Sequence, residues 1–218
     1  MKKNNRLLNI ILIIIALFPL VYLWSIWSKI PEIVPVHFNE KFEPDRTGPK
    51  SELIVSSAIL SAVSIFMLLL FQNIKRFDPK RRNEPNSGVF NKIAAGILIF
   101  TTAINFMLIT SSFKGASIFN NFFFPLLGLL FAFIGNYMNN IKPNYFAGIR
   151  LPWTLSDDDN WRKTHHMAGH LWFWGGLSIA VLALFLKAEV IFPILIATIV
   201  IMIIIPAIYS YRLFKNKQ

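Results

Sequence analysis

Apolar residues dominate six long runs in the sequence, and short polar segments separate these runs. A run of about 17 to 25 apolar residues is long enough to cross roughly 30 Å of hydrocarbon as an α-helix. The six runs cover approximately Leu7–Trp27, Leu53–Gln72, Ile93–Phe113, Phe122–Met138, His170–Leu186 and Val190–Tyr211. We therefore predict an all-α, polytopic membrane protein built as a six-transmembrane-helix bundle.

The polar segments divide the chain into three predicted parts. Residues 1–72 form a two-span unit with a proline-rich external loop at residues 28–52. Residues 73–92 form a basic cytoplasmic loop, and residues 93–218 form a four-span unit with a long cytoplasmic loop at residues 139–169. The two longest loops on the two sides of the membrane are the segments in which we expect function.

The chain has a large net charge but few charged residues. Lys and Arg number 22 against 11 Asp and Glu, for a formal charge of +11, yet 55% of the residues are hydrophobic and only 15% are charged. This composition argues against a basic soluble nucleic-acid binder. With both termini inside, 16 basic residues lie on the cytoplasmic side and 6 outside, as the positive-inside rule requires. We predict a multi-pass protein of the bacterial cytoplasmic membrane with cytoplasmic N- and C-termini.

A basic cluster lies in the loop at residues 73–92. It consists of Lys75, Arg76, Lys80, Arg81 and Arg82. We interpret the cluster as a topology signal that also attracts anionic lipid, and a protein-docking patch is the alternative.

The predicted spans contain no Asp, Glu, Lys or Arg. Ion-coupled transporters, proton relays and voltage sensors need charged groups inside the membrane, so the sequence argues against these mechanisms. Asn105 and Asn136 are the most polar residues in the spans. We expect interhelical hydrogen bonds from them, with the lining of a small polar cavity as the alternative.

Four prolines fall within the spans: Pro19, Pro125, Pro193 and Pro206. Proline has no N–H to donate, so a backbone carbonyl of the preceding turn is left free. We expect neighbouring helices to satisfy such carbonyls.

The external loop reads KIPEIVPVHFNEKFEPDRTGPKSE and carries prolines at positions 31, 35, 44 and 49. These prolines prevent a continuous helix and favour extended conformations in the residues before them. We expect a compact, ordered loop in which His37, Phe38 and Asn39 face an extracellular ligand. A structural, hydrogen-bonded role for His37 is the alternative.

The cytoplasmic loop reads NNIKPNYFAGIRLPWTLSDDDNWRKTHHMAG. Gly148 allows a turn or a close backbone approach. Ser156 and Asp159 form a capping-box pattern, and residues 157–159 place three carboxylates at the positive end of a helix, which we favour over a metal site. On this helix Trp161 and His165 share one face. We expect the helix to lie along the inner membrane surface with Trp161 in the headgroups, and to bend at Gly169 into the fifth span.

Two further histidines, His166 and His170, stand four residues apart, which is ligand spacing on a helix. A metal site would need a third ligand, and the glutamate of an HExxH motif is absent between them. The chain also lacks cysteine, which excludes a thiolate zinc site. We therefore predict no metal and no cofactor, with this pair as a weak candidate for metal binding.

One basic residue of the cytoplasmic loop, Arg150, is flanked by Ile149 and Leu151. We expect its guanidinium to be held by backbone carbonyls or by a carboxylate of residues 157–159. Phosphate binding is the alternative.

The two loops carry a family resemblance. The external segment, with its Pro, Pro, His-Phe-Asn and downstream Asp pattern, resembles a small domain of unknown function that often opens proteins of the SdpI family. The cytoplasmic segment resembles the C-terminal signature of that family. The residues that carry the second likeness are Asn144, Gly148, Ile149, Arg150, Pro152, Trp153, Thr154, Leu155, Trp161, Thr164 and His165.

The resemblance implies an immunity and signalling protein rather than an enzyme. Members of this family protect a cell from a secreted peptide toxin and hold a transcriptional autorepressor at the membrane. By this likeness the expected partners are the lipid bilayer, a toxin outside and a repressor protein inside, with no direct nucleic acid. The inner switch would consist of Asn144, Gly148, Arg150, Pro152, Trp153, Trp161 and His165.

Three other function classes stay open from the sequence. One is a metal-dependent membrane enzyme built on residues 157–159 with His165, His166 and His170. Another is a small peptide exporter, against which the uncharged spans argue. The third is a lipid-interacting structural protein whose loops brace the helices.

Overall fold

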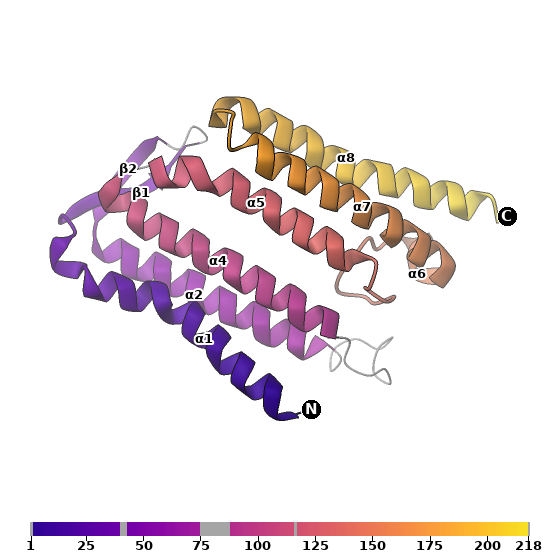
Figure 1. The fold of residues 1–218 in the computed structure, drawn as a ribbon, viewed down its shortest axis with the longest axis horizontal. Coiled ribbons are helices and arrows are strands. Elements are labelled where there is room, and N and C mark those ends of the chain that lie inside the picture. Colours follow the sequence, from indigo (N-terminus) through magenta and orange to yellow (C-terminus); the bar gives the residue numbers. More distant parts are fainter. Residues whose placement is uncertain (1, 40–42, 75–87, 116, 218) are drawn as a thin grey trace. The chain divides into compact units, whose positions relative to one another are not determined.

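The computed structural model describes residues 2–39, 43–74, 88–115 and 117–217, which are predominantly helical (Figure 1). Its elements are α1 (Lys2–Ser25), the 3-10 helix η1 (Trp27–Lys29), β1 (Ile33–Phe38), β2 (Pro44–Pro49), α2 (Ser51–Gln72), α4 (Gly88–Lys114), α5 (Ser117–Met138), α6 (Pro152–Ser156), α7 (Asp158–Leu182) and α8 (Ala188–Lys215). This confirms the all-α polytopic class. The basic cluster at residues 75–82 lies outside the described residues.

Helices α1, α2, α4, α5 and α8 are long and apolar enough to cross a membrane. The remaining predicted span falls on α7, which ends at Leu182 rather than at Leu186. From His170 to Leu182 the helix extends about 20 Å at its normal rise, which is short of the roughly 30 Å hydrocarbon core. The part of α7 that follows His170 is therefore shorter than the span predicted for residues 170–186.

The first compact unit contains residues 1–69 and 94–123. Its apolar core is formed by Leu23, Ile30, Val34, Leu53 and Ile109, which are all buried. This core joins the ends of the helices to the segment between α1 and α2.

That segment forms an antiparallel β-hairpin, in which Val34 pairs with Gly48 and Pro35 with Thr47. The prediction that this loop forms no continuous helix is confirmed for its described residues, but strand pairing was not foreseen. Proline is tolerated here because both strands of a two-stranded sheet are edge strands. The Ser112 hydroxyl donates to the Pro35 carbonyl over 3.0 Å and ties the hairpin to α4.

A polar seam joins α2 to α4 within this unit. The amide Nδ2 of Asn105 donates to the Ser57 carbonyl over 3.0 Å and to the Ser61 hydroxyl over 3.2 Å. The hydroxyls of Ser64 and Thr101 lie 2.6 Å apart. The interhelical hydrogen bonding predicted for Asn105 is confirmed, and the small serines let the two helices approach closely.

The second compact unit contains residues 70–93 and 124–218, and its α5 and α7 touch through glycine. A Cβ added at Gly176 would lie 2.6 Å from the Gly128 carbonyl oxygen, and one at Gly169 would lie 2.9 Å from that of Gly135. Because Gly169 is a packing residue inside a continuous helix, the predicted bend at Gly169 is wrong.

The contact between α7 and α8 includes a hydrogen bond at a proline. Pro206 has no N–H to give to the carbonyl of Met202, four residues earlier in α8. The indole Nε1 of Trp172 on α7 donates to this carbonyl over 3.2 Å. The expectation that a neighbouring helix satisfies such a carbonyl is confirmed at this proline.

Candidate functional site

The segment between α5 and α7 is folded around the buried side chain of Asn144. Its Nδ2 donates to the carbonyls of Lys142 and Ala147, each over 2.9 Å. Its Oδ1 accepts the N–H groups of Phe146 over 2.8 Å and of Ala147 over 2.7 Å. All of these bonds are local, so Asn144 fixes the turn that presents the following residues.

Gly148 brings this turn against α7. Its φ of +113° lies in the left-handed region, where side chains are disfavoured. A Cβ at this position would also overlap Nε2 of His165 and would lie 3.2 Å from the ring of Trp161. Beside it, the backbone N–H of Ile149 donates to His165 Nε2 over 3.0 Å. Glycine is therefore required here both for the backbone conformation and for the close approach.

Trp161 and His165 stack on each other inside the protein, with ring centroids 4.0 Å apart. Both side chains are only 1% exposed, and the Trp161 indole donates to the Ile141 carbonyl over 2.7 Å. The shared face predicted for this pair is confirmed. The placement of Trp161 in the lipid headgroups is wrong, because its ring is buried against His165 and has a hydrogen-bond acceptor within the chain.

The imidazole of His165 uses both of its nitrogens. Nδ1 lies 2.9 Å from the Trp161 carbonyl, which can only accept, so Nδ1 carries the proton and Nε2 accepts from Ile149. Burial lowers the pKa of His165 to about 4, and the bond to the Trp161 carbonyl opposes this only in part. The ring is therefore neutral near pH 7 and has no nitrogen left for a metal.

The short helix α6 is closed by Thr154 and attached to α8 by Trp153. The buried Thr154 hydroxyl donates to the Ile149 carbonyl over 2.8 Å and accepts the Leu151 N–H over 2.9 Å. The Trp153 indole donates to the Ser210 hydroxyl over 2.9 Å. These bonds make the family-like segment a rigid bridge between α7 and α8.

A second link to α8 comes from Asn160. Its Nδ2 donates to the Ser210 carbonyl over 2.9 Å, and its Oδ1 accepts the Thr164 hydroxyl over 3.0 Å. All three of these polar residues are buried. Neither Asn160 nor Ser210 was among the predicted site residues. The signal that could have pointed to Asn160 is its i, i+4 spacing to Thr164, whereas nothing in the sequence marks Ser210.

The helix α7 begins at Asp158, and Asp157 is its N-cap. The Asp157 carboxylate accepts the Asp159 N–H over 3.0 Å. The predicted cap, Ser156, is wrong by one residue because Ser156 ends α6 and its hydroxyl donates to the Trp153 carbonyl. The carboxylates therefore lie at the start of a helix, which is the interpretation that we favoured over a metal site.

Cations neutralise these carboxylates. The hydrogen bond from Lys217 lowers the pKa of Asp157, and those from Lys163 and then Arg162 lower the pKa of Asp159. The Nζ of Lys163 lies 2.8 Å from Asp159 Oδ2. Among the described residues, no group of three or more His, Cys, Asp or Glu side chains is placed to hold a metal ion. The Asp and His set of the enzyme alternative is therefore not brought together as one site.

Arg150 and Pro152 are both exposed, as are Tyr145 and Phe146 earlier in this segment. The Arg150 guanidinium donates to the carbonyl of Tyr145, so it has the kind of partner we expected, but it is not enclosed. Asn144, Trp161 and His165 are buried beside it, and the exposed Gly148 packs against the last two. We call these residues with Thr154 the loop core.

The hairpin residues lie in the other compact unit. His37 Nδ1 is 2.6 Å from Asp45 Oδ1, and the Asn39 Oδ1 accepts the Glu43 N–H over 3.0 Å. Both His37 and Asn39 therefore take part in hydrogen bonds within the hairpin region. Phe38 begins a stacked aromatic row that continues to Phe119, at a centroid distance of 6.2 Å, and on to Phe123.

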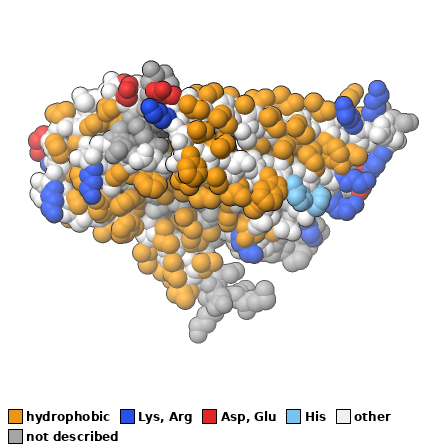
Figure 2. Space-filling view, turned by 45° about the horizontal axis from the view of Figure 1, so that its top comes forward, with side chains coloured by type: hydrophobic (Ala, Val, Ile, Leu, Met, Phe, Trp, Pro, Cys, Tyr) orange, Lys and Arg blue, Asp and Glu red, His pale blue; other side chains and the backbone are white. Residues whose placement is uncertain are grey.

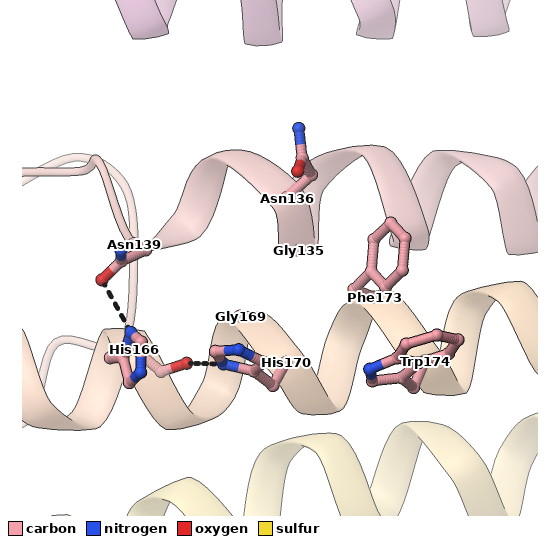
Figure 3. A pocket seen from close by; sticks show the side chains of 8 residues that line it. All are labelled: Gly135, Asn136, Asn139, His166, Gly169, His170, Phe173 and Trp174. Carbon is pink, nitrogen blue, oxygen red and sulfur yellow. Dashed lines mark hydrogen bonds between the residues drawn. The ribbon is translucent and has the colours of Figure 1, made fainter.

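A pocket of about 410 Å³ lies between α5 and α7. It is lined by Gly135, Asn136 and Asn139 on one side and by His166, His170 and Trp174 on the other (Figure 3). Cavity lining was the alternative given for Asn136. Figure 2 shows histidine side chains at the border between a mainly hydrophobic surface and a group of Lys and Arg side chains.

Comparison with known proteins separates the chain into two matched segments. Residues 140–210 match the SdpI/YfhL protein family, and residues 14–61 match a domain of unknown function, DUF1648. The Immunity protein SdpI of Bacillus subtilis (strain 168) is 24% identical over 221 residues, which cover 99% of this chain and 98% of that protein.

An uncharacterized protein of Archaeoglobus fulgidus is 41% identical over 67 residues, or 31% of this chain and 36% of that protein. No solved structure matches the chain significantly. The loop core and its links to α8 lie within the first matched segment, residues 140–210. The chain is therefore a multi-pass membrane protein in which residues 140–210 match the SdpI/YfhL family, with a DUF1648 domain in front of that segment.

Proposed function

We propose that this protein is an immunity protein that protects its cell from a secreted peptide toxin and holds a transcriptional repressor at the cytoplasmic face of the membrane. The observation that carries the proposal is the match to the Immunity protein SdpI, which extends over 99% of this chain. That match includes both the hairpin segment and the loop core, so we assign one part of the proposed function to each of them.

The hairpin is the proposed receptor for the toxin. The distribution of basic residues favours an external position for it. A hydrophobic peptide that reaches the membrane from outside would meet the aromatic row of Phe38, Phe119 and Phe123, next to the polar pair of His37 and Asp45. Aromatic rings beside a polar rim suit an amphipathic ligand at the headgroup level.

The segment around Arg150 is the proposed docking site for the repressor. Arg150 offers an exposed cation that is steadied by the carbonyl of Tyr145. The loop core holds this segment rigidly against α7, and Trp153 fixes the adjoining α6 to α8. A rigid support lowers the ordering cost of binding, which favours a partner protein that recognises a fixed surface.

Toxin binding outside can change repressor binding inside only if the two ligands prefer different arrangements of the helices. A change in the charge of His165 is not the proposed signal, because its lowered pKa keeps the ring neutral in the cytoplasm. The proposed signal is instead a shift in how α7 and α8 pack, which would move the segment that both helices hold.

Two substitutions with matched controls test the proposal in cells that lack the native gene. The variant Phe38→Ala should lose survival in supernatant from a toxin-producing strain, whereas Phe185→Ala, which removes a highly exposed ring elsewhere, should not. The variant Arg150→Ala should keep survival but lose membrane recruitment of the repressor, with Arg162→Ala as the control. Survival that is equal with and without the wild-type protein would contradict the immunity role.

A further inference from the structure

The pocket between α5 and α7 contains two histidines that the loop core does not use. His166 and His170 are exposed and lie on consecutive turns of α7, with ring centroids 4.6 Å apart (Figure 3). Asn139, which directly follows α5, reaches the His166 ring. The proximity of the rings alone does not identify a ligand, but their hydrogen bonds fix which nitrogens are available.

The protonation of His170 follows from its partner. Its Nδ1 lies 2.8 Å from the carbonyl oxygen of His166, and a carbonyl can only accept. Nδ1 therefore carries the proton of the neutral ring, and Nε2 carries the lone pair. Within the described part of the chain, Nε2 of His170 has no hydrogen-bond partner.

The ring of His166 is held by Asn139, the residue that follows α5. Its Nδ1 lies 3.3 Å from Oδ1 of Asn139, which is also an acceptor, so the lone pair again belongs to Nε2. A metal-ligating histidine usually donates its other ring N–H to a carbonyl or carboxylate, because this fixes the tautomer and the ring orientation. Both rings of this pair have that arrangement, whereas His165 has both nitrogens occupied.

We propose that His166 and His170 bind one divalent transition-metal ion through their Nε2 atoms. Imidazole nitrogens suit zinc, nickel and copper rather than magnesium or calcium, which prefer oxygen. Two protein ligands leave the other coordination positions to water, for which the pocket of about 410 Å³ has room. The site is thus an open, exchangeable one and not a closed structural centre.

A metal at this position would act on the packing of the second unit. It would join two turns of α7 at the level where Asn139 meets the helix, while Gly135 and Gly169 keep α5 and α7 in backbone contact there. Binding would therefore stabilise this end of the α5–α7 contact. The inference is independent of toxin immunity and of repressor binding.

Calorimetric titration of the full-length protein with zinc alone tests the site, using a purification tag that contains no histidine. The expected result is one zinc ion per chain. In separate titrations, copper should bind more tightly than nickel or zinc. His166→Ala and His170→Ala should each weaken binding at least tenfold. Asn139→Ala should weaken zinc binding by about 10-fold, because the His166 ring loses the hydrogen-bond acceptor that orients it.

The control is His37→Ala, because His37 belongs to the hairpin and should not affect binding. Zinc should also raise the midpoint of thermal unfolding of the wild-type protein and of the control, but not that of the His170→Ala variant. Because both histidines are exposed, their replacement should leave the fold intact. Absence of zinc binding by the wild-type protein, or full binding by the His166→Ala/His170→Ala double variant, would overturn the proposal.

Discussion

The backbone N–H of Ile149 donates to Nε2 of His165 over 3.0 Å, so a side chain of α7 holds a loop residue sixteen positions away. The bond exists only while Nε2 is unprotonated. The neighbouring Gly148 lets the backbone come this close. The geometry of the candidate docking segment thus depends on a neutral, buried histidine.

The stability of the protein should fall when the pH is lowered from about 6.5 to about 4. His165 has a pKa of about 4 in the folded chain, below the roughly 6.5 of an unfolded histidine. Between pH 6.5 and 4 this histidine takes up a proton in the unfolded chain but not in the folded chain. Its contribution to the unfolding free energy is therefore fully present above pH 6.5 and falls by about 3 kcal/mol as the pH is lowered to 4.

The variant His165→Gln keeps an acceptor near the Ile149 N–H but cannot titrate in this range. Its unfolding free energy, measured in detergent, should therefore lose most of the pH dependence between pH 6.5 and 4. Equal slopes in the wild-type protein and the His165→Gln variant would show that the buried ring is not responsible.

Replacing Gly148 by alanine should destabilise the loop core more than the same change at Gly115. Both glycines have positive φ, of +113° and +95°, but an added Cβ meets His165 and Trp161 at the first, whereas at the second it meets no atom of the described residues within 4 Å. The cost of placing a Cβ on a backbone with positive φ, about 1–2 kcal/mol, applies to both variants. Overpacking should add about 1–3 kcal/mol at Gly148 alone, and chemical denaturation of the two variants measures the difference.

The start of α7 offers a test of the corrected cap. The variant Asp157→Ala should cost about 1 kcal/mol, as loss of a side-chain cap does, because the Asp157 carboxylate accepts the Asp159 N–H. The variant Ser156→Ala should cost only a few tenths, since Ser156 lies in α6. Unfolding midpoints in the same detergent compare the two, and a larger loss at Ser156 would restore the cap expected from the capping-box pattern.

The backbone contact between α5 and α7 should not tolerate a side chain. An alanine Cβ at Gly176 would lie 2.6 Å from the Gly128 carbonyl oxygen and 2.8 Å from the Phe131 Cβ. One at Gly88 would meet no atom within 4 Å among the residues that the structure describes. Gly176→Ala should therefore lower stability by about 1–3 kcal/mol, while Gly88→Ala should be neutral or slightly stabilising. Thermal unfolding followed by circular dichroism distinguishes these outcomes.

The helices could be predicted from the sequence because hydrocarbon thickness sets a simple length for apolar runs. The fifth predicted span shows the limit of that rule, since the polar first half of α7 belongs to the same helix and buries Asn160, Thr164 and His165 in the protein. Hydropathy reports the average character of a run but not which of its residues have internal partners.

The candidate site was predicted in part. The stacking of Trp161 on His165 follows from their spacing on one helix, and Gly148 was recognised as a place of close approach. The burial of Trp161 was missed because its acceptor is the carbonyl of Ile141, and a carbonyl has no signature in the sequence. Pairing within the external loop was missed because proline usually argues against strands, although edge strands accept it.

The proposed two-sided function requires the hairpin and the loop core to face opposite sides of the membrane. Because the chain has no cysteine, single cysteines can be introduced at the exposed positions Thr47 and Ser156 without other labelled sites. In intact cells a membrane-impermeant maleimide should label the Thr47→Cys variant and should reach the Ser156→Cys variant only after permeabilisation. Labelling of both cysteines in intact cells, or of Ser156→Cys alone, would contradict a toxin receptor outside and a repressor site inside.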